Sequence, residues 1–109
     1  MINRRCEVQF ANEKVKKAFE NLEKEDINLK KFIERAFCDI QANPFCGIQI
    51  KKELIPKEYI KKFDIGNVWK YNLPNAWRLI YSIRGDEAII ITIVLEWMDH
   101  KSYEKRFNY

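Results

Sequence analysis

The sequence is poor in the residues that bind metals or form disulfides. It has a single histidine, and its three cysteines (Cys6, Cys38 and Cys46) are scattered without a CxxC pair. These residues lack the spacing of a zinc site, so we expect no metal and no cofactor. An odd number of scattered cysteines indicates free thiols in a reducing compartment.

Long apolar segments are also missing. The apolar run Ala88–Leu95 has the length of a strand, well short of the roughly 20 residues that span a membrane. The first residues, MINRRCEVQF, carry two arginines but no apolar segment after them, so no signal peptide is predicted. We find no repeat or linker, and a length of 109 residues favours one domain over 1–109. We therefore expect a soluble cytoplasmic protein.

The composition is that of a globular and mildly basic chain. It is 47% hydrophobic and 33% charged, with 20 basic and 16 acidic residues and a net charge of +4. This charge is compatible with a polyanionic partner but does not require one. The basic residues form two groups along the chain: Lys51, Lys52, Lys57, Lys61, Lys62 and Lys70, then Lys101, Lys105 and Arg106.

The segment Val68–Trp97 is interpreted as three consecutive antiparallel strands. Its apolar runs are separated by short segments containing proline, asparagine, glycine and aspartate, which are typical of tight turns. We predict strands at Val68–Leu73, Trp77–Ile83 and Ala88–Trp97, with turns at Pro74–Ala76 and Arg84–Glu87. The third run is almost entirely apolar, which fits a central strand covered on both faces.

Alternation assigns the side chains of the first two strands to two faces. One face is apolar and predicts the core: Trp69, Tyr71, Leu73, Trp77, Leu79, Tyr81 and Ile83. The three tryptophans, including Trp97, are interpreted as core aromatics. The other face displays Lys70, Asn72 and Arg78, and we expect function there.

The N-terminal part predicts one strand and two amphipathic helices. Arg5–Phe10 is interpreted as a strand, and Asn12 can cap the helix that follows it. Apolar residues at helical spacing predict helices over Val15–Leu22 and Leu29–Ile40, with a break at Glu23–Asn28. The second helix ends near Asn43, because the following Pro44 disfavours helix in the residue before it. We expect the two helices to form an antiparallel hairpin.

Two shorter helices are predicted further along. Pro56 can start a helix over Lys57–Phe63, with Tyr59, Ile60 and Phe63 as its buried side. Asp99 can cap a terminal helical segment that carries His100, Tyr103 and Phe107. The fold class is therefore α+β: a small twisted, mostly antiparallel sheet in which the first strand pairs with the meander and the helices lie on one face.

The order of these segments resembles the RelE/ParE superfamily of toxins from type II toxin–antitoxin modules. Trp77-Arg78-Leu79-Ile80-Tyr81 is similar to the family's "YRLVY"-type strand, and the helix ending Gln41-Ala42-Asn43-Pro44-Phe45 also matches. The tail from Trp97 to Tyr103 is similar to the family's His-basic-Tyr ending. The resemblance covers nearly the whole chain.

The resemblance implies a toxin neutralised by a small antitoxin, which is expected to be acidic. RelE-type members cleave mRNA on the ribosome without a metal, whereas ParE-type members inhibit DNA gyrase by binding. The shared fold does not choose between these activities, and a binding module with degraded activity is a third alternative. The oligomeric state stays open, with a toxin–antitoxin heterotetramer as one arrangement.

The resemblance also indicates which residues would perform RNA cleavage. Arg78 matches the strand arginine that contacts the scissile phosphate, and a guanidinium group suits that contact. Lys70 would hold the phosphate or act as a base, although Asn72 stands where RelE has a second lysine. His100 would serve as general acid or base. Tyr103 would stack on a base or donate a proton, with core packing as its alternative role.

Other charged residues are candidates for supporting roles. Five lysines are interpreted either as a diffuse patch that attracts RNA or as a solvated face of the protein: Lys51, Lys52, Lys61, Lys62 and Lys101. Glu96, beside Trp97, is a weaker candidate for a catalytic carboxylate.

Overall fold

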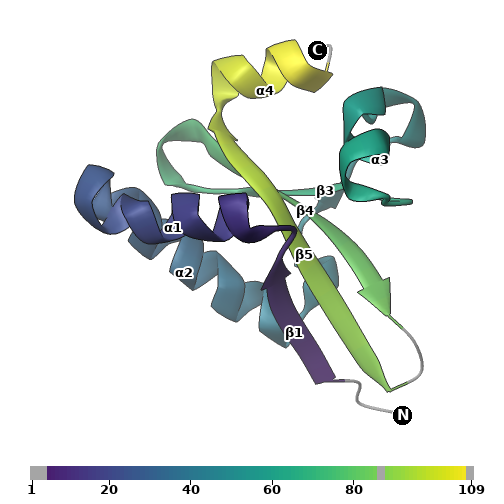
Figure 1. Ribbon diagram of the computed structural model, residues 1–109, viewed down its shortest axis with the longest axis horizontal. Coiled ribbons are helices and arrows are strands. Elements are labelled where there is room, and N and C mark those ends of the chain that lie inside the picture. Colours follow the sequence, from purple (N-terminus) through teal and green to yellow (C-terminus); the bar gives the residue numbers. More distant parts are fainter. Residues whose placement is uncertain (1–4, 86–87, 108–109) are drawn as a thin grey trace.

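A five-stranded sheet forms the centre of the molecule (Figure 1). The computed structural model describes residues 5–85 and 88–107. The strand order is β1-β5-β4-β3-β2, and β1 runs parallel to β5 while the other neighbours are antiparallel. The strands are β1 (Arg5–Phe10), β2 (Ile48–Gln49), β3 (Trp69–Asn72), β4 (Trp77–Gly85) and β5 (Ile89–Asp99). The predicted α+β class and the pairing of the first strand with the meander are confirmed.

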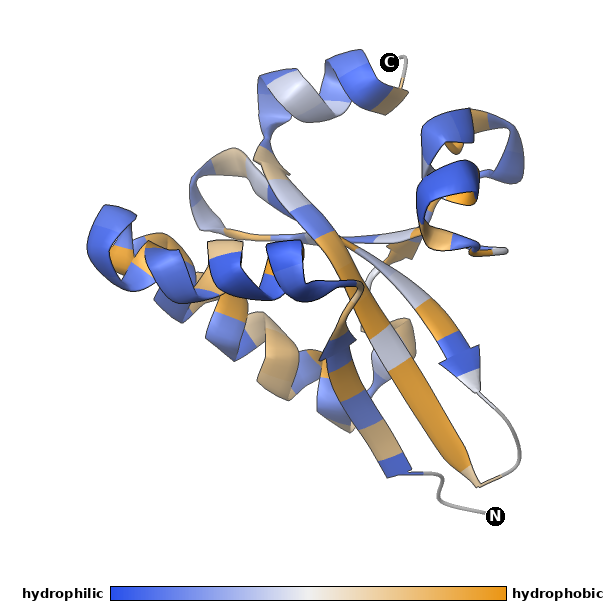
Figure 2. Cartoon of the chain, in the orientation of Figure 1, coloured by the Kyte–Doolittle hydropathy of each residue, from blue (hydrophilic) through white to orange (hydrophobic). Residues whose placement is uncertain are grey.

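The strand β5 lies between β1 and β4, which confirms its predicted central position. Its neighbouring residues Val94 and Leu95 belong to two different clusters of the core. Successive side chains of a strand point to opposite faces, so both faces of β5 are covered. Coverage on both faces explains the apolar stretch that Figure 2 shows along this strand.

The hairpin of α1 (Glu13–Glu25) and α2 (Ile27–Ala42) covers one face of the sheet. As predicted, the Asn12 side chain caps α1 by accepting a hydrogen bond from the backbone N–H of Val15 at 2.9 Å. The predicted break at Glu23–Asn28 is too long, because only Asp26 separates the helices and caps α2. Of the predicted apolar side of the meander, Leu73, Leu79 and Tyr81 are buried on this face, and the other four residues are partly buried against them. The buried cluster consists of Leu22, Leu29, Ile33, Ala36, Ile40, Leu73, Leu79, Tyr81 and Val94. The three tryptophans pack against this cluster, as predicted.

The opposite face is covered in part by α3 (Lys57–Phe63) and α4 (His100–Phe107). The neighbouring residues Leu79 and Ile80 belong to different clusters, so the two clusters lie on opposite sides of β4. The second cluster contains Ile50, Tyr59, Ile65, Val68, Ile80, Leu95, Met98, Tyr103 and Phe107. The prediction that the helices lie on one face therefore holds for the hairpin and is wrong for the two short helices. The face of Lys70 and Arg78 is consequently part of a small second core.

The segment between α2 and β3 differs most from prediction. Besides the two-residue strand β2, it contains short 3₁₀ helices at Pro44–Cys46 and Lys52–Leu54. The bounds of α3 agree with prediction, but Ile60 is 49% exposed. Tyr59 and Phe63 form the inward stripe of this short helix, with ring centroids 5.8 Å apart, and Ile60 lies beside that stripe.

The turns of the meander were predicted at Pro74–Ala76 and Arg84–Glu87. Pro74–Ala76 forms the first turn as predicted, and Asn75 and Ala76 have positive φ. Two residues of the second predicted turn, Arg84 and Gly85, belong to β4, and the other two, Asp86 and Glu87, lie outside the described residues. No helix in the described part of the chain is both long and apolar enough to cross a membrane.

Candidate active site

The register of β4 and β5 brings the residues of the candidate site together. Trp77 pairs with Asp99 and Arg78 pairs with Met98, and α4 begins at His100, directly after Asp99. The side chain of Arg78 reaches past the end of the ladder to His100, with Nη2 and Nδ1 3.2 Å apart. The adjacent strand β3 continues this row, because its Asn72 pairs with Arg78. Lys70 lies two residues before Asn72 and therefore on the same face.

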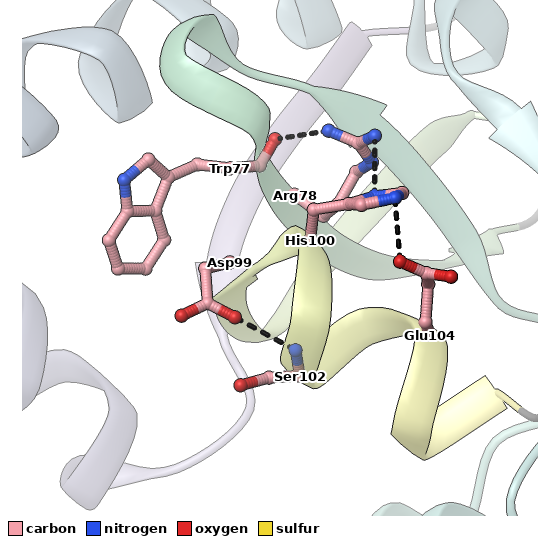
Figure 3. A network of polar contacts seen from close by, with 6 residues as sticks. All are labelled: Trp77, Arg78, Asp99, His100, Ser102 and Glu104. Atoms are coloured by element: carbon pink, nitrogen blue, oxygen red, sulfur yellow. Dashed lines mark hydrogen bonds and ion pairs between the residues drawn. The ribbon is translucent and has the colours of Figure 1, made fainter.

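The guanidinium group of Arg78 is only partly satisfied (Figure 3). Its Nη1 donates to the carbonyl of Trp77 at 3.2 Å, and its Nη2 lies 3.2 Å from Nδ1 of His100. Its Nε is buried and has no hydrogen-bond partner among the described residues. A buried N–H without an acceptor is costly, so this group favours an incoming acceptor such as an anionic oxygen.

The imidazole of His100 bridges Arg78 and Glu104 (Figure 3). A guanidinium group can only donate, so Nδ1 of His100 must accept the hydrogen bond from Arg78. The proton of the neutral ring then sits on Nε2, which lies 2.8 Å from Oε1 of Glu104. The two residues are four apart on α4 and half exposed, so they share one side of the helix at the surface.

Tyr103 forms the floor beneath the two cations. Its ring is 1% exposed and stacks on Phe107, with centroids 4.7 Å apart. Nζ of Lys70 lies 4.7 Å from the ring centre and Cζ of Arg78 lies 5.9 Å from it. Cations near an aromatic ring are attracted by its π electrons, so Tyr103 helps to hold both charges. The ring has no open face for stacking of a base, and the packing role that was the alternative for Tyr103 fits its position.

The start of α4 is fixed by Asp99, as predicted. Its Oδ1 accepts a hydrogen bond from the backbone N–H of Ser102 at 2.8 Å. This bond, together with one from the Ser102 hydroxyl, holds the pKa of the Asp99 carboxyl below its usual range. The cap therefore positions His100 and Tyr103 in the first turns of the helix.

The remaining candidates lie outside this cluster. The five lysines of the expected steering patch are exposed: Lys51, Lys52, Lys61, Lys62 and Lys101. Glu96 binds Arg106 through both carboxylate oxygens, at 2.8 Å each. That pairing leaves Glu96 as a structural ion-pair partner. Asn72 is exposed at the end of β3.

Glu104 is the site residue that the sequence reasoning missed. Its spacing of four residues from His100 on a predicted helix is the signal that would have identified it. Within residues 5–85 and 88–107, no three His, Cys, Asp or Glu side chains are grouped to hold a metal ion. Cys6, Cys38 and Cys46 are free thiols.

Comparisons with protein-family models, with curated proteins and with solved structures find no match for this chain.

Proposed function

We propose that this protein is the toxin of a type II toxin–antitoxin module and an endoribonuclease that cleaves mRNA on the ribosome. The four residues expected to carry the chemistry (Lys70, Arg78, His100 and Tyr103) come from β3, β4 and α4 and lie in one cluster. An inhibitor that acts by contact alone has no need of such a cluster, so its presence supports the enzymatic function over inhibition of gyrase.

The single observation that carries the proposal is the unsatisfied edge of Arg78. Nε has no partner, and the Nη2 group contacts only the neutral nitrogen of His100 among the described residues. Nε and Nη2 are the pair that binds two oxygens of a phosphate in parallel. A scissile phosphate on this edge would satisfy Nε and replace His100 as the partner of Nη2.

The same exchange would prepare the base. Once Arg78 turns to the phosphate, Nδ1 of His100 is free to accept the proton of the ribose 2′-OH. Glu104 then stabilises the charged ring through its Nε2–H. The 2′-oxygen forms a bond to phosphorus as the bond to the 5′-oxygen breaks, and the departing 5′-oxygen takes a proton from water, which leaves a 2′,3′-cyclic phosphate and a 5′-OH end. Arg78 and Lys70 offset the negative charge that grows on the phosphate. No metal ion is needed for these steps.

The wider setting follows from this activity. The exposed lysines would steer the basic protein toward ribosomal and messenger RNA in the cytoplasm. A small acidic antitoxin would neutralise it when bound.

The test is inducible expression of the wild type and Arg78→Ala, with mapping of mRNA 5′ ends after induction. We expect wild type to stop growth and to cut translated messages in frame with codons. We expect Arg78→Ala to cleave about 100- to 1000-fold more slowly, the effect of losing one group that stabilises charge in a transition state.

Two further variants make this test specific. Arg84→Ala removes another arginine of the same strand, one that donates to the carbonyl of Asp64 at 2.9 Å, and should leave cleavage unchanged. His100→Ala changes a half-exposed side chain and should fold while losing cleavage. Growth arrest without cleavage would favour a binding toxin, and no arrest by a folded protein would favour an inactive relative.

A further inference from the structure

A groove of about 330 Å³ lies beside the second half of β5, apart from the candidate active site. Its lining comes from α1, α3, β5 and α4, and it includes none of Lys70, Arg78, His100 and Tyr103. The helices α1 and α3 lie on different sides of β5 (Figure 1), so the groove lies where the two core clusters meet. Small-molecule sites occupy about 300–1000 Å³, so this volume suits a small ligand better than a helix or strand of a partner.

The walls of the groove are mainly apolar. Val15 and Trp97 pack with the cluster on the side of the helical hairpin, whereas Phe63 and Leu95 pack with the cluster on the opposite side of the sheet. An alkyl chain that enters the groove would leave water and contact both clusters, which is favourable. The walls therefore favour a ligand with an apolar body.

Tyr59 contributes a buried polar group without a partner. It lines the groove and is 2% exposed, and its hydroxyl has no hydrogen bond within the described part of the chain. The rings of Phe63 and Phe107, with centroids 5.8 Å and 5.7 Å away, hold the Tyr59 ring in place. Burial, and then the neighbouring Glu96 carboxylate, raise the pKa of Tyr59, so the hydroxyl keeps its proton. The hydroxyl is thus a donor that an incoming oxygen would satisfy.

The charges at the groove decide which acceptor is favoured. Lys14 and Lys62 line it without a salt bridge to any described residue, and Glu58 is the single acidic lining residue of that kind. Glu96, which also lines the groove, is neutralised by its two hydrogen bonds with Arg106. Two unpaired cations against one unpaired carboxylate favour a negatively charged oxygen over a neutral one.

We propose that this groove is a binding site for a small carboxylate with an apolar chain. The chain lies against Phe63, Leu95 and Trp97, and the carboxylate accepts a hydrogen bond from Tyr59. The proposal does not depend on RNA cleavage, because no residue proposed for that reaction lines the groove.

The test is a titration of the ¹⁵N-labelled full chain with three probes that share one alkyl chain length: octanoate, 1-octanol and octylamine. Octanoate, kept below the concentration at which it forms micelles, should give saturable shifts of the amides of Leu95, Trp97 and α3. 1-Octanol should bind about tenfold more weakly because it carries no charge, and octylamine should bind more weakly still.

The variant Tyr59→Phe removes only the hydroxyl. It should weaken octanoate binding about tenfold, because a hydrogen bond to a charged group is lost. The hydroxyl has no partner in the free protein, so the same variant should not lower the midpoint of urea unfolding. The matched variant Tyr71→Phe removes a hydroxyl that bonds Asp39 outside the groove, and should leave octanoate binding within about twofold of wild type.

A second pair of variants tests the charges. Lys14→Gln/Lys62→Gln removes two cations from the groove and should weaken octanoate binding about fivefold. Lys16→Gln/Lys57→Gln removes the same charge from the same two helices outside the groove, and should stay within about twofold of wild type. All four lysines are exposed, so both variants should keep the wild-type fold.

Four results would overturn the proposal. They are no saturable octanoate shifts at the groove, binding of 1-octanol or octylamine as tight as that of octanoate, unchanged octanoate binding by Tyr59→Phe, and a lowered unfolding midpoint for Tyr59→Phe. The last result would show that the hydroxyl is already bonded in the free protein and is not a donor for a ligand.

Discussion

Arg78 and His100 form a contact in which each group determines the state of the other. Arg78 can only donate, so it fixes the acceptor nitrogen of His100, and Glu104 holds the protonated nitrogen on the other side. In this arrangement the lone pair of His100 Nδ1 accepts a hydrogen bond from Arg78. The imidazole can act as a base only after Arg78 donates to another acceptor. A substrate phosphate would be such an acceptor, so binding and activation of the base would be one event.

The tautomer of His100 is directly measurable, because it is the single histidine of the chain. We predict that ¹⁵N spectra of the neutral ring show the proton almost entirely on Nε2. The double variant Arg78→Ala/Glu104→Ala should give a mixture of the two tautomers, since both constraints are gone. A wild-type signal from protonated Nδ1 would contradict the described contact.

At the scale of elements, the cap of α4 determines where His100 and Tyr103 lie. The hydrogen bonds from Ser102 lower the pKa of Asp99 in the folded protein. A lowered pKa contributes stability that is present above the unfolded value, about 3.9, and is lost as the pH falls through the folded value. The helix should therefore loosen in acid.

The variant Asp99→Asn isolates this contribution, because an amide oxygen still accepts from Ser102 but does not titrate. We predict that wild type loses unfolding free energy relative to Asp99→Asn as the pH falls from about 5 to about 2. Urea unfolding of both proteins across this range measures the difference, and carboxylates common to both cancel. A difference that does not change with pH would show that the cap contributes no titrating interaction.

The loop between α2 and β2 is attached to the sheet by Tyr81. Its buried hydroxyl donates to the carbonyl of Pro44 at 3.0 Å and accepts from the N–H of Gly47 at 3.1 Å. A Cβ at Gly47 would lie 2.3 Å from this hydroxyl and 2.6 Å from the carbonyl of Lys70, so the close approach requires glycine. This attachment therefore also supports the strand that carries Lys70.

Removing the hydroxyl should destabilise the fold. We predict that Tyr81→Phe lowers the free energy of unfolding by about 1–3 kcal/mol, because it leaves a buried donor and acceptor without partners. Tyr71→Phe is the matched control: its hydroxyl bonds Asp39 near the surface, where that bond raises the pKa of Tyr71 to about 12. Its loss should cost less than about 1 kcal/mol. Equal losses of unfolding free energy for the two variants would mean that the buried hydrogen bonds of Tyr81 contribute no more than the surface bond of Tyr71.

At the scale of the whole molecule, the local patterns of the sequence predicted more than its long-range contacts. The period of two in β3 and β4 identified which side chains enter the core, because alternation is a local property of a strand. The caps at Asn12 and Asp99 were visible for the same reason. The two-residue strand β2 was not, since its exposed Ile48 and Gln49 become a strand only through pairing with β3.

The candidate site was predictable as a set of residues but not as a geometry. The predicted third strand ended at Trp97, whereas β5 continues to Asp99 and so places His100 directly beside Arg78. The face of the sheet that carries Arg78 is covered through contacts between distant segments, which no local pattern encodes. The rings of Tyr59 and Phe107, for example, have centroids 5.7 Å apart. The spacing of Glu104 from His100 on a predicted helix was a usable signal, but the contact of His100 with Arg78, which gives that pair its place in the site, depends on geometry.

The most direct test of the proposed chemistry is the nature of the RNA ends. Purified protein would be mixed with ribosomes carrying a message in the A site, with either ribose or 2′-deoxyribose at the scissile nucleotide. We predict that only the ribose message is cut, leaving a 2′,3′-cyclic phosphate and a 5′-OH, and that Arg78→Ala loses this product while Arg84→Ala keeps it. Cleavage of the deoxyribose message, or ends with a 3′-OH and a 5′-phosphate, would contradict attack by the 2′-OH.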